Sequence, residues 1–81
     1  MEARDFSRVR LHRVTKDPQG YIFYEAEFRK APLSASVIRD EIRQVKRSGL
    51  DCYRYGFFSR SGFQCQPDEN QIFIDIKQVY P

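Results

Sequence analysis

The chain has 81 residues, of which 41% are hydrophobic and 15% aromatic, enough for one small folded domain with a thin core. This apolar content excludes wholesale disorder. Lys and Arg number 14 against 11 Asp and Glu, giving a formal net charge of +3, which permits an anionic partner without requiring one. We expect residues 1–81 to form a single α/β domain.

Several classes of site are excluded by the residues that are missing. The two cysteines, Cys52 and Cys65, have no short metal-ligand spacing, and His12 is the only histidine, so a Cys/His zinc site would lack its fourth ligand. The sequence contains neither a Walker phosphate-binding loop nor a serine nucleophile elbow. With no signal peptide and no apolar run long enough to span a membrane, we expect a cytoplasmic protein with reduced thiols and no membrane partner.

The first two elements form a predicted β-hairpin. SRVRLHRV (7–14) alternates apolar and basic side chains, DPQG (17–20) has turn chemistry, and a second strand covers 21–28. The favoured register pairs Lys16 with Tyr21 and sets His12 opposite Glu25, and Arg10 opposite Glu27. A glycine bulge in the turn would shift the pairing by one residue and set Arg13 opposite Glu25.

The second strand has two chemically different faces, because side chains alternate along a strand. Glu25 and Glu27 share one face with two aromatic residues. The other face carries the side chains that we expect to form the core, namely Ile22, Tyr24, Ala26 and Phe28.

A helix is predicted over 35–48, with Ser34 as its N-cap and Gly49 ending it. A narrow apolar stripe of Ile38, Ile42 and Val45 indicates that one face packs on the sheet. The remaining surface is basic, interrupted by two acids. Its basic residues are Arg39, Arg43, Lys46 and Arg47.

DCYRYGFFS (51–59) predicts a third strand, parallel to the second because a helix connects them. A polar loop follows, and QIFIDI (71–76) predicts a fourth strand. The expected fold is therefore a small ββαββ unit of three-layer type, with a mixed sheet and one crossover helix.

Residues 24–63, YEAEFRKAPLSASVIRDEIRQVKRSGLDCYRYGFFSRSGF, resemble the C-terminal domain of bacterial and archaeal AAA-type ATPases, the DUF234 group. FFSRSGF (57–63) is the most specific part of this resemblance. The group is similar to the PD-(D/E)xK nuclease superfamily, so the resemblance implies a restriction-endonuclease-like core. It also implies that the chain is part of a larger ATPase, whose ATPase domain would be a partner.

The superfamily places an acid on the first hairpin strand and an acid followed by a lysine on the second, with Mg²⁺ held by the acids. By this resemblance Glu25 occupies the acid position and Glu27 the lysine position. The first strand offers Arg10, His12 and Arg13 instead of an acid, and Asp5 is a further candidate ligand. We therefore expect a vestigial catalytic site without a required cofactor, in which Glu25 and Glu27 bind a cation weakly at most.

Two further features are candidates for phosphate binding. Ser59, Ser61 and Gly62 form a turn after the third strand, where backbone N–H groups can bind phosphate, although a simple tight connection also fits. Clustered basic residues can follow a nucleic-acid backbone, although a solvated helix face also fits. The candidate nucleic-acid contacts are Arg29, Arg39, Arg43 and Arg60.

The sequence thus predicts a non-catalytic, nuclease-like accessory module of an ATPase that binds nucleic acid or a protein. Two alternatives stay open: an Mg²⁺-dependent nuclease using Glu25 and Glu27, and an interaction or dimerisation domain whose exposed sheet edge pairs between copies. The sequence does not fix the oligomeric state.

Overall fold

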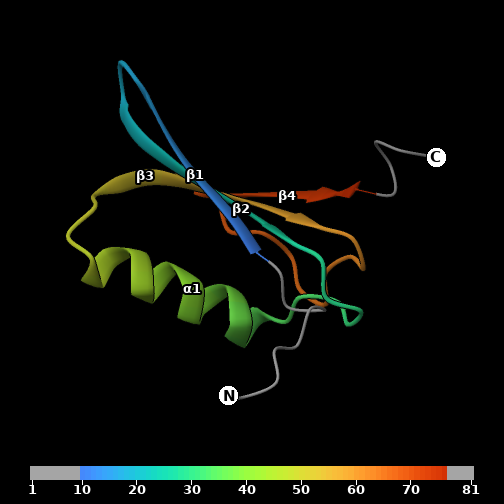
Figure 1. The fold of residues 1–81 in the computed structure, drawn as a ribbon. Helices are drawn as coiled ribbons and strands as arrows, with labels where there is room; N and C mark the ends of the chain where they lie inside the picture. Colours follow the sequence, from blue (N-terminus) through green and yellow to red (C-terminus); the bar gives the residue numbers. More distant parts are fainter. Residues whose placement is uncertain (1–9, 77–81) are drawn as a thin grey trace, which may run out of the picture.

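The computed structural model describes residues 10–76 and has the predicted order ββαββ (Figure 1). In the described residues a four-stranded sheet has the order β1-β2-β3-β4, with one helix on one side. The elements are β1 (Arg10–Asp17), β2 (Gly20–Glu27), α1 (Ala35–Arg47), β3 (Cys52–Ser59) and β4 (Gln71–Asp75). The expected small α/β unit with a mixed sheet and a crossover helix is confirmed.

The β1–β2 hairpin has the favoured register. Lys16 pairs with Tyr21, His12 with Glu25, and Arg10 with Glu27, so the bulged alternative is wrong. Asp17 holds the turn, because its Oδ1 accepts hydrogen bonds from the backbone N–H groups of Gln19 (2.8 Å) and Gly20 (3.2 Å). β1 continues to Asp17, past the expected end at Val14, since pairing extends to Asp17 and Gly20. Residues 7–9 lie outside the described residues.

The other strand pairs are parallel, as the connecting helix predicted. β3 pairs with β2 along its length, with an irregularity where Tyr21 is followed by Ile22, and β4 pairs with β3. Beyond this irregularity Glu25 lies beside Phe57, and Glu27 beside Ser59. The carboxyl ends of β2 and β3 therefore meet at one edge of the sheet.

The helix begins and ends where its capping residues require. Ser34 is the N-cap, and its Oγ accepts a hydrogen bond from the Val37 N–H at 3.3 Å. Gly49 follows the last turn with φ +88°, a conformation that favours glycine. The helix lies across the sheet, so its apolar stripe has a surface to cover (Figure 1).

The core lies on the face of β2 that carries Glu25 and Glu27, opposite the face that was expected to form it. Phe23 is buried there with Tyr55 and Phe57 of β3, under Ile38 and Val45 of the helix. The side chains expected in the core are only half-buried on the opposite face: Ile22, Tyr24, Ala26 and Phe28. The expectation was wrong because both faces of β2 carry aromatic side chains, and the position of α1 decides which face is buried.

No described element covers the opposite face. A depression of about 690 Å³ lies on it, lined by apolar side chains with Arg13 beside them. The apolar lining residues are Leu11, Tyr24, Ala26, Phe58 and Ile74. Residues 10–76 thus form two layers, and the expected third layer is not among them. None of their helices has the length and apolar character needed to cross a bilayer.

Candidate metal centre

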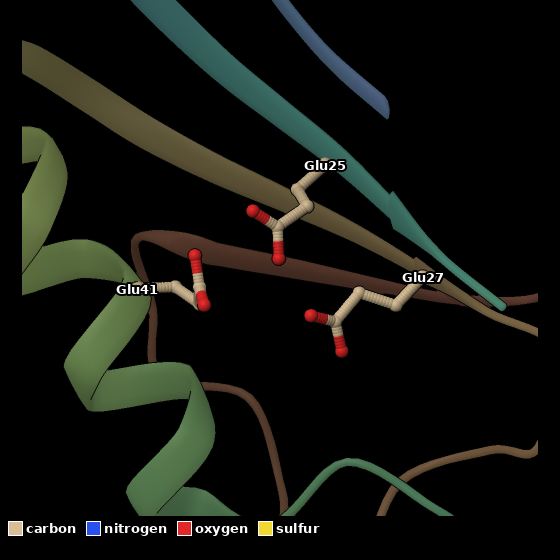
Figure 2. A group of neighbouring side chains, drawn as sticks. All are labelled: Glu25, Glu27 and Glu41. Atoms are coloured by element: carbon tan, nitrogen blue, oxygen red, sulfur yellow. The ribbon is translucent and has the colours of Figure 1, made fainter. Parts of the chain in front are cut away.

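Three glutamate side chains converge between the sheet and the helix (Figure 2). Glu25 and Glu27 project from β2 toward α1, and Glu41 projects from α1 toward them. One carboxylate oxygen from each residue lies within 4.8 Å of the other two. We refer to Glu25, Glu27 and Glu41 as the glutamate cluster.

Regular secondary structure brings these side chains together. Glu25 and Glu27 are two residues apart on a strand, so they share a face. Glu41 lies three residues after Ile38 and four before Val45, which places it in the stripe that faces the sheet. All three are buried: Glu25 and Glu27 are 1% exposed, and Glu41 is 8% exposed.

The buried carboxylates of Glu25 and Glu27 lack hydrogen-bond donors. Neither oxygen of either group has a hydrogen-bond partner among residues 10–76. Two basic side chains approach without hydrogen-bond geometry: His12 Nε2 is 3.3 Å from Glu25 Oε1, and Arg29 Nε is 3.2 Å from Glu27 Oε2. Buried carboxylates are normally paired or hydrogen-bonded. The negative charge on these oxygens is therefore costly unless a proton or a cation neutralises it.

Burial, together with the neighbouring Glu41 and Glu27, raises the pKa of Glu25 to about 9. Desolvation is the main cause, because it disfavours the charged carboxylate. The close approach of the Glu41 and Glu27 carboxyl groups, and their negative charges, raise the pKa of Glu25 further. Without a cation, one proton therefore remains on the glutamate cluster at neutral pH.

The glutamate cluster fits a hard divalent cation. Carboxylate oxygens are the ligands that Mg²⁺, Mn²⁺ and Ca²⁺ prefer, and two oxygens on opposite sides of one such ion lie about 4–5 Å apart. The 4.8 Å separation meets this requirement. Glu41 and His12 also line a pocket of about 330 Å³ between the hairpin and α1, which gives the cluster a side that opens outward.

The hairpin supplies no acid opposite Glu25, as the sequence indicated. His12 takes that position and contacts Glu25, with its own side chain 52% exposed. Arg13 lines the depression on the opposite face of the sheet. Arg10 is opposite Glu27, and Asp5 lies outside the described residues.

The hydroxyl groups of the candidate phosphate loop have partners within the protein. Ser59 is fully buried, and its Oγ accepts a hydrogen bond from the Ser61 N–H at 3.2 Å. Ser61 Oγ donates to the Arg29 carbonyl at 2.7 Å, and the Gly62 carbonyl accepts from the Leu33 N–H at 3.0 Å. These bonds favour the tight connection over a phosphate site.

The candidate nucleic-acid contacts do not form one surface but lie in separate parts of the described structure. Arg29 lies beside the glutamate cluster, and Arg60 is exposed in the loop after β3. Arg39 and Arg43 line a groove of about 320 Å³ between α1 and the residues leading into β4, together with Lys46 and Asn70. Arg43 also pairs with Asp40 at 3.4 Å on the exposed side of the helix.

Sequence reasoning missed Glu41, which it treated only as an interruption of the basic helix surface. The signal was present, because the spacing to Ile38 and Val45 puts Glu41 in the apolar stripe. No protein-family model, curated protein or solved structure matches the chain. The resemblance to the DUF234 group and to PD-(D/E)xK nucleases therefore stays a prediction based on the residues quoted above.

Proposed function

We propose that this chain binds a divalent cation at the glutamate cluster and a nucleic-acid backbone beside it, as a nuclease-like accessory module of an ATPase. One observation carries the proposal: three buried carboxylates converge, and those of Glu25 and Glu27 lack hydrogen-bond donors in the described part of the chain. Three ionised carboxylates at this separation repel one another, and a divalent cation removes that repulsion. The weak cation site expected from two glutamates gains a third ligand in Glu41.

Each residue has a separate role in this proposal. Glu25, Glu27 and Glu41 hold the cation through oxygen ligands, the type that Mg²⁺ and Mn²⁺ require. The exposed Arg60 and the partly exposed Arg29 lie at the carboxyl ends of β3 and β2, where open α/β sheets bind ligands. Phosphate contacts of this kind carry affinity without sequence preference.

Glu41 also favours a second candidate function, an Mg²⁺-dependent nuclease, because it supplies an acid that the hairpin lacks. A bound cation stabilises the charge that develops on a phosphate and lowers the pKa of bound water. Glu27 still stands where the superfamily has a lysine, which weighs against catalysis. Cleavage of plasmid DNA with Mn²⁺, lost in Glu25→Gln, would support the nuclease, whereas no cleavage would leave the binding module.

The proposal is tested by isothermal titration of the chain with Mn²⁺ and with Mg²⁺. We expect the wild-type chain to bind one ion. Glu41→Gln should bind this ion about tenfold more weakly, or more weakly still, since one charged ligand is lost. Asp40→Asn is the matched control. It removes the same charge from the neighbouring residue, whose side chain is exposed. A wild-type chain that takes up no ion, or equal weakening in both variants, would contradict the proposal.

A further inference from the structure

Arg29 is the arginine that contacts the glutamate cluster within the described residues. Its Nε lies 3.2 Å from Glu27 Oε2, with the Arg29 side chain 23% exposed and that of Glu27 2% exposed. This Nε is buried and has no hydrogen-bond partner in residues 10–76, so the contact with Glu27 is a charge interaction without hydrogen-bond geometry. Arg29 therefore bridges the buried carboxylate and the solvent.

The backbone around Arg29 is fixed to the loop after β3. Ser61 Oγ donates a hydrogen bond to the Arg29 carbonyl at 2.7 Å, and the Arg60 N–H donates to the Glu27 carbonyl at 3.3 Å. These bonds hold the carboxyl ends of β2 and β3 together. Any movement of the Arg29 guanidinium is then a change of side-chain torsions on a fixed backbone.

A bound cation and the Arg29 guanidinium compete for Glu27. Each neutralises the same carboxylate, so a cation that takes Glu27 as a ligand weakens the hold of Glu27 on Arg29. A guanidinium released in this way stays at the edge of the cluster, close to solvent, because the backbone that carries it is fixed. Its planar set of N–H donors matches the oxygens of a phosphate.

We propose that Arg29 exchanges partners, from Glu27 in the cation-free chain to a backbone phosphate of nucleic acid in the cation-bound chain. This inference rests on the proposed function and extends it, because it makes cation binding and phosphate binding depend on one side chain.

The exchange predicts that Arg29→Gln shifts two affinities in opposite directions. Loss of the competing guanidinium is expected to raise Mn²⁺ affinity about two- to tenfold, measured without nucleic acid by the disappearance of the free Mn²⁺ signal in electron paramagnetic resonance. Affinity for a short duplex DNA in saturating Mg²⁺ is expected to fall. The slope of its logarithm against log salt should decrease by about 1, because one phosphate contact is lost.

Two further variants separate this role from a structural one. Arg29→Lys keeps the charge and should preserve the salt slope while losing part of the affinity for DNA. Arg13→Gln removes the same charge from the opposite face of the sheet and should leave both measurements unchanged. Amide NMR spectra of each variant establish that it is folded.

Two results would overturn the exchange of partners by Arg29 without overturning the proposed function. The first is weaker Mn²⁺ binding in Arg29→Gln, which would mean that Arg29 only positions Glu27. The second is an unchanged salt slope, which would mean that Arg29 does not reach phosphate. If the wild-type chain takes up no Mn²⁺, the proposed function and the exchange both fail.

Discussion

Among the described residues, Glu25 has a strongly raised pKa, so its protonation affects the stability of the cation-free chain. Its pKa is about 9 in the folded chain against 4.5 for an ordinary glutamate. The stability that comes from the neutral carboxyl is complete below about pH 4.5 and is lost as the pH rises through about 9. Burial without a donor is the main reason, and like charge from Glu41 and Glu27 adds to it.

Glu25→Gln should therefore stabilise the cation-free chain at alkaline pH. Glutamine fills nearly the same volume and is neutral without taking up a proton on folding, so we expect an increase of about 1–3 kcal/mol in the free energy of unfolding at pH 8. At pH 5 the variant and the wild type should differ much less. Urea unfolding at both pH values, with chelator present, measures this difference. A variant less stable than the wild type at pH 8 would contradict the account.

The pairing of β2 with β3 depends on a close contact between Tyr24 and Gly56. The two residues are neighbours in the parallel register, and a Cβ placed on Gly56 would lie 2.6 Å from Cδ1 of the Tyr24 ring. Glycine is required here because the ring lies over the backbone, on the face that α1 does not cover. The sequence shows both residues but not their alignment.

Gly56→Ala should lower the free energy of unfolding by about 1–3 kcal/mol, because the Tyr24 ring has to move. In a Tyr24→Leu background the same change should cost less, since the smaller side chain leaves room for the methyl group. Denaturant unfolding of the four proteins of this cycle gives the coupling. An equal cost in both backgrounds would show that the ring is not the cause.

At the level of elements, the sequence predicts what short-range rules determine. Ser34 and Gly49 mark the helix ends, and the DPQG turn with its alternating strands gives the hairpin register. The buried face of β2 did not follow from the same rules, because both faces carry aromatic side chains and only the placement of α1 distinguishes them. Glu41 was missed for the same reason, since its role depends on which strand residues lie beneath it.

For the whole molecule, one helix covers one face of a mixed sheet in residues 10–76. The core between these two layers is thin, and the glutamate cluster occupies part of it. Three carboxylates in that position oppose folding unless a proton or a cation neutralises them. The same burial that makes the cluster costly makes a bound cation stabilising, because binding to the folded chain alone shifts the folding equilibrium.

The most direct test of the central claim, that the glutamate cluster binds a divalent cation, is paramagnetic broadening of the amide NMR spectrum by substoichiometric Mn²⁺. We predict that signals are lost first around Glu25 and Glu27 in β2 and around Glu41 in α1, two segments that only the folded chain brings together. Mg²⁺ in excess should restore them. Broadening confined to exposed acids such as Asp68 and Glu69, or no broadening at all, would contradict the claim.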